Sequence, residues 1–363
     1  MLVQRVVTPT GSVSWTVVGS DGPPVAPIEG YLAHLAAIER SPNTVRAYAH
    51  SLKLFFEFLA AQQQSFDEAG VEDVSRFVAF LRAPVTGVVP LNEAAAARTE
   101  ATVNRHLAAV FGFYDHQARN GVELAANLVV YRKVGRGSYK PFLHGIARSQ
   151  PVATRPIRLK VPTKLPPTLS DEQVMLILAA CRRRRDRFLF ALLAETAMRV
   201  GQALGLRHAD FVSRERTVRI VARADNANGA RAKCRQGTEI PISAALARLY
   251  SEYMHVEYGD LDSDYVFVNL WGKPYGGALT YRTVDGMVRR LRACTGIVFN
   301  PHMLRHSRAS ELIRSGVAIE VVSKLLTHAS VATTSSIYVH LGVEDLRAEL
   351  ERAGVWEQRD GSW

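Results

Sequence analysis

The sequence predicts a mainly α-helical protein with a small antiparallel β-sheet, in two domains joined by a basic linker. Apolar residues recur at helical spacing over most of the chain, and the alternation typical of strands is confined to a few short segments. The 363 residues suit two domains of ordinary size. Between the two helical regions, residues 131–168 contain nine lysines and arginines and no acidic residue, and their prolines disfavour a helix.

The composition narrows the class of partner and the compartment. Lys and Arg number 45 against 34 Asp and Glu, a net charge of +11. We therefore expect a polyanionic partner, with nucleic acid ahead of a membrane, and a basic enzyme with another substrate is the alternative. The three cysteines form no CxxC pair, which indicates a reducing compartment without disulfides or a zinc site. The first residues lack a signal-peptide core, and no apolar run approaches the roughly 18 residues that a membrane span needs.

Residues 1–27 are predicted to form a β-hairpin-like extension. Alternating runs at Leu2–Val7 and Val13–Val18 flank the turn-prone sequence PTGS. Arg5 is the only basic residue of this segment. We therefore expect the hairpin to pack against the protein rather than to act as a separate DNA-binding arm.

Residues 28–127 are predicted to form a helical domain. Ser41 or Asn43 is the expected N-cap of its second helix, with Pro42 in the first turn, and Gly121 is the expected stop of its fourth helix. Backbone N–H groups at helix starts can hold a phosphate. We therefore expect contacts with DNA near the starts of the second and fourth helices, with solvated polar faces as the alternative. The candidate DNA-binding residues are Thr44, Arg46, Asn104 and Arg105.

Residues 128–168 are predicted to be an extended basic linker. A strap of this charge could lie along a phosphate backbone, and Lys160 is its DNA-binding candidate. A solvated linker between domains, which needs no ligand, is the alternative.

Residues 169–345 are predicted to form a second, mixed α/β domain. Ser170 caps a helix that continues through the run CRRRR, a buried helix follows at RFLFALLAETA, and Arg199 comes shortly after it. A hairpin is predicted from two strands, with Lys233 on its return side. The predicted strands are Thr217–Val221, Glu239–Ile242 and Tyr265–Val268, and the later helices are Ala244–Tyr258, Thr283–Cys294 and Glu344–Ala353. Residues 346–363 form a C-terminal tail that either docks onto a neighbouring subunit or frays.

The segment Pro301–His340 carries the most informative pattern. As a helix, its first part places His302, Arg305 and His306 on one stripe, which continues with apolar residues. A charge on a buried stripe costs free energy unless it meets a partner, and a phosphate would supply one.

These residues, with His328 and Tyr338 after them, suit phosphoryl transfer. Arg199 and Arg305 could clamp a phosphate and stabilise the charge that develops on its oxygens. An adjacent positive charge favours a phenolate, so Tyr338 could attack phosphorus, and a lysine or histidine could protonate the departing oxygen. Taken singly, each residue has a structural explanation: Tyr338 as a core residue, His328 as a helix cap, and Arg199 as the partner of Glu195. Motifs for zinc proteases, ATP binding and serine hydrolases are absent from the sequence.

In order and spacing, these boxes resemble those of the tyrosine recombinases, the phage-integrase-like enzymes that break and rejoin DNA. AMRVGQALGLRHADF resembles the first box, HMLRH the H-x-x-R-H box, LLTHAS the third-histidine box, and SSIYVHL the nucleophile box. SPNTVRAYAHSLKLFFEFL and ATVNRHLAAVFGFYDH resemble the helical core-binding domain of the family. The implied catalytic residues are Tyr338, Arg199, Lys233, His302, Arg305 and His328, with His306 in support.

The resemblance implies a fold and a mechanism. A helical core-binding domain and a mixed α/β catalytic domain would form a C-shaped clamp around DNA. Tyr338 would attack the scissile phosphate and leave a 3′-phosphotyrosine and a free 5′-hydroxyl. Lys233 would protonate the leaving oxygen, His302 would act as acid/base near the tyrosine, and His328 would donate a hydrogen bond to the phosphate. No cofactor and no metal are implied.

The resemblance also implies partners and a setting. The partners would be double-stranded DNA with inverted core sites and three further copies of the chain. These would form a homo-tetramer on two duplexes, acting through a Holliday junction, and the free protein would be a monomer or dimer. Accessory proteins could take part. The setting would be the bacterial cytoplasm, in association with the nucleoid.

The chain also departs from the family pattern. Gln202 stands where Glu is usual, Thr327 where Gly commonly precedes the histidine, and Arg308 where an aromatic or apolar residue is usual. The hairpin is longer than in compact members, so Arg231 and Arg235 compete with Lys233 for its assignment. Its length resembles that of site-specific transposases of mobile elements. Two other functions stay open, a type IB topoisomerase-like DNA relaxase and a non-catalytic DNA-binding regulator.

Overall fold

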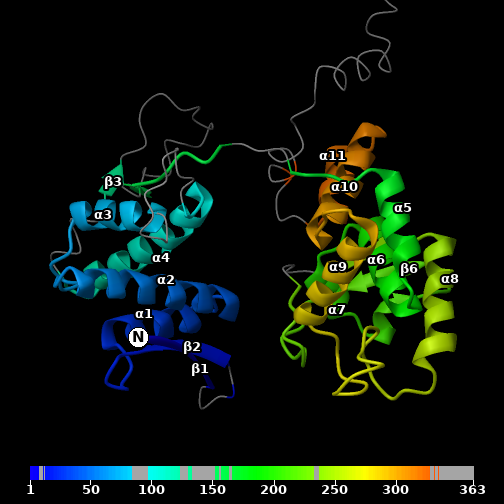
Figure 1. Ribbon diagram of the computed structural model, residues 1–363, viewed down its shortest axis with the longest axis horizontal. Coiled ribbons are helices and arrows are strands. Elements are labelled where there is room, and N and C mark those ends of the chain that lie inside the picture. The colour runs from blue at the N-terminus through cyan, green and yellow to red at the C-terminus, as the bar shows by residue number, and fades with distance from the viewer. Residues whose placement is uncertain are drawn as a thin grey trace, which may run out of the picture. The chain divides into compact units, whose positions relative to one another are not determined.

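The computed structural model describes residues 1–7, 11, 13–83, 97–122, 130–132, 152–154, 157–162, 166–232, 237–327, 331 and 334. The chain divides into two compact units, Met1–Thr163 and Lys164–Trp363 (Figure 1). This division falls inside the segment predicted as a linker, and each unit has its own apolar core. No described helix is both long enough and apolar enough to cross a bilayer.

The described part of the first unit combines four helices with a hairpin. The helices enclose an aromatic core that includes Phe55, Phe77 and Phe113. The strands pair antiparallel where the alternation predicts them, and Figure 1 shows this hairpin beside α1 and α2. Val17 of the hairpin is buried in the helical core, so the hairpin packs against the protein. The elements are β1 (Leu2–Val7), β2 (Val13–Val18), α1 (Ala26–Ala37), α2 (Pro42–Ala61), α3 (Val71–Arg82) and α4 (Glu100–Arg119).

The ends of these helices follow local sequence rules. The Ser41 hydroxyl accepts a hydrogen bond from the Thr44 N–H at 3.2 Å, which confirms Ser41 as the N-cap of α2, and Pro42 is the first helical residue. Gly121 follows α4 with a φ of +90°, a conformation that glycine adopts without strain.

The basic segment after α4 is partly built into the first unit. Strands β3 (Val130–Arg132) and β4 (Val152–Thr154) pair antiparallel. Further along, Ile157 and Leu159 pack against the helical core. The Asn104 side chain on α4 donates to the Leu159 carbonyl and accepts from the Leu159 N–H, both at 2.9 Å. The prediction of an extended linker missed these contacts because their partners lie far apart in the sequence.

The second unit is mainly helical with one small antiparallel sheet, as predicted. Helix α6 is buried along most of its length and lies at the centre of the unit, between α8 and α10 (Figure 1). The sheet has the strand order β5-β6-β7, and β6 and β7 form the predicted hairpin. The helices are α5 (Asp171–Ala180), α6 (Arg184–Thr196), α7 (Val200–Leu204), α8 (Ala244–Tyr253), α9 (Tyr281–Thr295), α10 (Pro301–Arg314) and α11 (Ile319–Leu325), and the strands are β5 (Phe211–Val212), β6 (Thr217–Ile220) and β7 (Thr238–Pro241).

Several predicted boundaries in this unit were wrong. The helix after Ser170 ends at Ala180, and α6 begins within the arginine run, where the Glu257 carboxylate accepts the N–H groups of Arg184 and Arg185 at 2.9 Å. A carboxylate at this position satisfies amides that have no partner within the helix and suits the helix dipole. The predicted strand 265–268 makes only isolated bridges, and β5 was not predicted. The predicted helix 344–353 and the tail 346–363 lie outside the described residues.

We expect Asn104→Ala to destabilise the first unit by roughly 1–3 kcal/mol, because it leaves the half-buried peptide groups of Leu159 without their partners. Urea unfolding should show the loss, and hydrogen exchange should speed up at the Leu159 amide. Arg105→Ala is the matched control, because Arg105 is exposed next to Asn104 on α4, and it should change stability by less than about 0.5 kcal/mol. An unchanged hydrogen-exchange rate at the Leu159 amide in the Asn104 variant would show that these two hydrogen bonds do not hold the segment in place.

Candidate active site

Three of the predicted catalytic residues meet at one cavity in the second unit. Arg199 is the N-cap of α7, and His302 and Arg305 lie on α10. All three line a cavity of about 340 Å³, although the two boxes that contain them are far apart in the sequence. The complete lining is Met198, Arg199, Val200, Gly201, Arg231, Tyr281, Val284, Asp285, Asn300, Pro301, His302 and Arg305.

Arg305 is almost wholly buried, with 2% of its surface exposed. Its guanidinium donates to the Ala197 carbonyl at 2.7 Å and to the Leu326 carbonyl at 2.5 Å. These carbonyls cap the C-terminal ends of α6 and α11, where helix dipoles favour a cation. The sequence suggested a phosphate as the partner of this charge, whereas the structure also provides backbone carbonyls. The apolar continuation of the stripe packs into a small core with the same two helix ends, as predicted.

Arg199 belongs to a hydrogen-bond network with the two neighbours that depart from the family pattern. Its guanidinium donates to the Thr327 hydroxyl at 3.1 Å, and its backbone N–H donates to the Gln202 side-chain oxygen at 2.7 Å. The Gln202 amide nitrogen donates to the same Thr327 hydroxyl at 3.0 Å. The alternative pairing with Glu195 is wrong, because α6 ends before Arg199 and the Glu195 carboxylate accepts hydrogen bonds from Ser243 instead.

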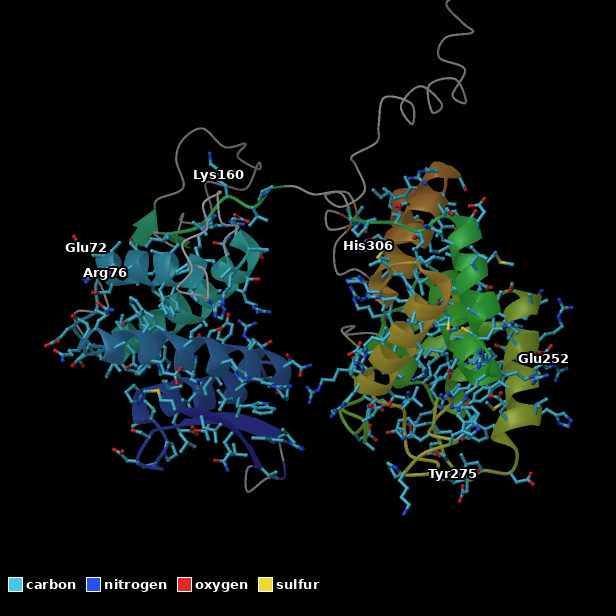
Figure 2. The ribbon with its side chains drawn as sticks, in the orientation of Figure 1. Glu72, Arg76, Lys160, Glu252, Tyr275 and His306 are labelled. Atoms are coloured by element: carbon cyan, nitrogen blue, oxygen red, sulfur yellow. The ribbon has the colours of Figure 1, made fainter. Side chains whose placement is uncertain are left out.

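The rings of His302 and His306 on α10 lie with their centroids 4.8 Å apart and are tilted by 32° to one another, and Figure 2 labels His306. Partial burial lowers the pKa of His302, and the positive charges of Arg305 and Arg199 lower it further. Burial, with His302 and Arg305 nearby, lowers the pKa of His306 to about 4. Both imidazoles are therefore neutral at neutral pH, so His302 can accept a proton. The fixed positive charge of the cavity comes from its guanidinium groups.

Tyr281, the first residue of α9, is a cavity residue that the sequence did not reveal. Its hydroxyl lies near the backbone of Arg231, just before the position predicted for the hairpin lysine. A Cβ atom on Gly201 would lie 2.1 Å from the Tyr281 hydroxyl oxygen and 2.9 Å from the Arg231 carbonyl oxygen. Glycine is therefore needed where the first box meets the base of the hairpin. The glycine two residues after Arg199 was the only sequence signal of this contact.

Several predicted site residues lie outside the described residues, namely Lys233, His328 and Tyr338, together with the competing Arg235. Their roles stay predictions. Of the two alternatives to the hairpin lysine, Arg231 is described, and it lines the cavity. The part of the chain that the structure describes contains no group of three or more His, Cys, Asp or Glu side chains that could hold a metal ion.

The candidate DNA-binding residues lie in the first unit. Arg46, Arg105 and Lys160 are exposed, and Figure 2 shows Lys160 at the edge of this unit. The Arg46 guanidinium lies 4.8 Å from the centroid of the Trp15 ring. A DNA contact stays a prediction for these three residues.

The other two candidates already have protein partners. The Thr44 hydroxyl lies 2.9 Å from the Ser41 hydroxyl. Asn104 holds the Leu159 peptide, which is a structural role that the sequence did not suggest.

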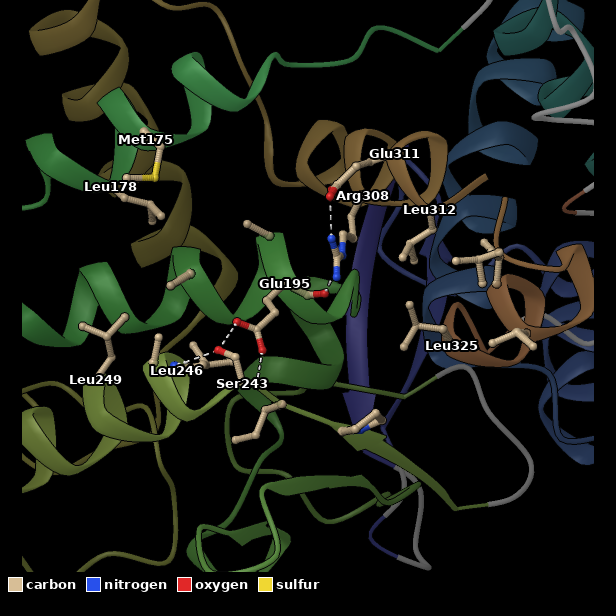
Figure 3. Close-up of a pocket in the computed structure, with 18 residues that line it drawn as sticks. Met175, Leu178, Glu195, Ser243, Leu246, Leu249, Arg308, Glu311, Leu312 and Leu325 are labelled. Atoms are coloured by element: carbon tan, nitrogen blue, oxygen red, sulfur yellow. Dashed lines mark hydrogen bonds and ion pairs between the residues drawn. The ribbon is translucent and has the colours of Figure 1, made fainter. Parts of the chain in front are cut away.

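A second, larger cavity in the second unit has different chemistry. It measures about 830 Å³, and mainly aliphatic side chains from α5, α6, α8, α10 and α11 line it (Figure 3). Its charged residues bind one another or nearby groups: Arg308 donates to Glu311 at 2.7 Å and to the Glu195 carbonyl at 3.1 Å. Arg308, which replaces a usual aromatic or apolar residue, is thus held by α6 and by its own helix. Because this cavity lacks clustered arginines and histidines, the smaller one is the candidate active site.

Comparison with known proteins shows the family of the chain. Residues 167–344 match the phage integrase family, and residues 28–121 match the phage integrase N-terminal SAM-like domain. Transposase A from transposon Tn554 of Staphylococcus aureus is 34% identical over 330 residues, which cover 90% of this chain and 91% of that protein. The chain belongs to the phage integrase family. It is a tyrosine recombinase, an enzyme that breaks and rejoins DNA strands by phosphoryl transfer.

Two more distant proteins are also similar, one in sequence and one in fold. The tyrosine recombinase XerD of Mycobacterium tuberculosis is 27% identical over 339 residues, covering 88% of this recombinase and 94% of XerD. The Tn1549 transposon integrase, solved in complex with transposon right end DNA, superimposes with a TM-score of 0.61 at 15% identity. That superposition covers 90% of this chain and 99% of the integrase, so the two share a fold.

We expect the recombinase to lose stability as the pH falls from about 6.5 towards 4, with His306 as one cause. The pKa of His306 is about 4 in the folded protein against 6.5 for a free histidine, so in this window the unfolded chain binds a proton that the folded chain does not. Stability therefore falls with falling pH, and His306→Gln should make the decline shallower. Urea midpoints from pH 4 to 7 for both proteins test this, since all other titrating groups are shared. Parallel curves would contradict it.

Proposed function

We propose that this recombinase is a site-specific transposase that cuts and rejoins DNA through a covalent 3′-phosphotyrosine and a Holliday junction. The observation that carries the proposal is the convergence of Arg199, Arg305 and a neutral His302 on one cavity. Two guanidinium groups suit a phosphodiester that gains negative charge during attack. Similarity to a transposase over nine-tenths of the chain supports the transposase role.

The proposed mechanism assigns one task to each side chain. Tyr338 attacks the scissile phosphorus while His302 accepts its proton, and the bond from phosphorus to the 5′-oxygen breaks as Lys233 protonates that oxygen. His328 donates a hydrogen bond to the phosphate. A 5′-hydroxyl from the partner strand then attacks the phosphotyrosine and releases Tyr338. The phosphodiester energy is kept in the enzyme–DNA bond, so the reaction needs no cofactor.

The structure supports preorganisation of the arginine side of this site. The two carbonyl bonds of Arg305 fix the plane of its guanidinium, and Thr327 and Gln202 hold both ends of Arg199. Donors that are already oriented stabilise developing charge without reorganisation during the reaction.

We further propose how the recombinase assembles. Its substrate is double-stranded DNA with inverted core sites, and the active form is a homo-tetramer on two duplexes that assembles from monomers or dimers. Arg46, Arg105 and Lys160 contact phosphates, and accessory proteins set the direction of the reaction. A net charge of +11 supports binding to DNA, and we place the activity in the bacterial cytoplasm, on nucleoid DNA.

We expect a nicked suicide duplex, made from the DNA that flanks the gene, to trap the wild-type recombinase as a covalent adduct. Tyr338→Phe should form no adduct while it still binds the duplex, because phenylalanine has no nucleophilic oxygen. The matched control is Tyr275→Phe, at an exposed tyrosine that does not line the cavity (Figure 2), which should trap normally. An adduct formed by Tyr338→Phe would show that the nucleophile is another residue.

A plasmid with two target sites should yield recombinant products, and their yield should be unchanged by EDTA because the proposed chemistry uses no metal. A plasmid with one site measures relaxation separately. Relaxation without recombinants would favour a topoisomerase-like relaxase, and DNA binding without either product would favour a regulator.

A further inference from the structure

Two departures from the family pattern, Gln202 and Thr327, contact each other beside Arg199. Gln202 is buried, and Thr327 follows the Leu326 carbonyl that Arg305 holds. Thr327 thus contacts Arg199 through its hydroxyl and follows the residue that contacts Arg305. Both arginines line the cavity.

Hydrogen-bond chemistry fixes the orientation of the Gln202 amide. The Arg199 backbone N–H can only donate, so the Gln202 atom 2.7 Å from it is the carbonyl oxygen. The amide nitrogen of Gln202 then faces Thr327, 3.0 Å from its hydroxyl oxygen. An amide nitrogen can only donate, and so can the Arg199 guanidinium, which lies 3.1 Å from the same oxygen.

The Thr327 hydroxyl therefore accepts two hydrogen bonds. A hydroxyl has two acceptor positions and one proton. Because both acceptor positions are used, the proton must point in a third direction, away from Gln202 and Arg199. No acceptor for it occurs among the residues whose positions the structure gives.

The backbone at Thr327 adopts a conformation that its side chain disfavours. Its φ is +50°, in the left-handed region that favours glycine and that β-branched residues rarely adopt. Strain of this kind persists where the surroundings impose it, and it clusters at functional sites. Glycine would remove the strain and would also remove the hydroxyl.

We propose that Thr327 is an additional phosphate ligand, whose hydroxyl donates its proton to a non-bridging oxygen of the phosphate that Arg199 binds. Gln202 is the positioning residue that directs this proton. A glutamate at position 202 would have the opposite effect: its carboxylate has no proton to donate, so Thr327 would donate to it and be lost to the phosphate. The inference rests on the proposed phosphoryl transfer at this cavity.

The test is single-turnover cleavage of the nicked suicide duplex, with thermal unfolding of each variant measured alongside. Thr327→Val keeps the branched shape and Thr327→Gly removes the strain, and we expect each to slow cleavage roughly 10–100-fold, the value of a hydrogen bond to a charged group. Thr327→Gly should unfold at no lower temperature than the wild type. Thr327→Ser keeps the hydroxyl and should cleave roughly tenfold faster than Thr327→Val.

Gln202→Glu tests the direction of the proton. It should slow cleavage in the wild-type background and have no further effect in the Thr327→Gly background, because the hydroxyl that it redirects is gone. A methylphosphonate at the cleavage position replaces one non-bridging oxygen of the phosphate with a methyl group, and it has two diastereomers. In the diastereomer that lacks the oxygen bound by Thr327, the substitution Thr327→Gly should slow cleavage less than it does with the normal phosphate.

Three results would overturn the inference. The first is a Thr327→Gly variant that cleaves at the wild-type rate, and the second is equal cleavage rates for Thr327→Ser and Thr327→Val. The third is a double variant in which the effects of Gln202→Glu and Thr327→Gly on the cleavage rate add. These outcomes are separable from failure of the proposed function. If Tyr338→Phe abolishes the adduct while the Thr327 variants cleave normally, only the role of Thr327 is rejected. If the wild type forms no adduct, the proposed phosphoryl transfer itself is rejected.

Discussion

The buried guanidinium of Arg305 is the contact on which the rest of the catalytic unit depends. A charge that is 2% exposed is costly unless hydrogen bonds satisfy it, and Arg305 meets this condition by joining the C-terminal ends of α6 and α11. Arg199 lies two residues after Ala197, which ends α6, and Thr327 comes directly after Leu326, which ends α11. One buried ion thus helps to bring two distant boxes of the sequence into contact, where Arg199 meets Thr327. Removing it would leave two buried carbonyls without partners and free both helix ends.

The electrostatics of the cavity follow from this arrangement. Burial and the neighbouring arginines lower the pKa values of His302 and His306, so the imidazoles stay neutral and the guanidiniums supply the positive charge. A neutral histidine beside arginines can take a proton from a nucleophile, and it becomes positively charged when it does so. The larger cavity behind Arg308 is aliphatic, and its charges are paired. The candidate active site is therefore chosen by the chemistry of the lining and not by the size of the cavity.

The first unit shows how far local sequence rules extend. The hairpin, the Ser41 cap and the Gly121 stop depend on neighbours within a few residues, and the sequence predicts them well. The position of the segment around Leu159 depends on hydrogen bonds to Asn104, which lies more than fifty residues earlier in the sequence. The composition of this segment suggested only a linker. The same limit explains the errors in the second unit, where Glu257 decides the start of α6 from a distant position.

The sequence by itself determined the fold class, the two helical regions and the boxes that contain Arg199, His302 and Arg305, because helical spacing and motif order are local properties. It also marked Gln202 and Thr327 as unusual, without a reason for either. Only the tertiary structure showed that Gln202 and Arg199 both donate to the Thr327 hydroxyl, that a side chain at position 201 would meet Tyr281, and that Asn104 holds the Leu159 peptide. These are contacts between segments that folding brings together, and their geometry depends on packing that no local pattern records.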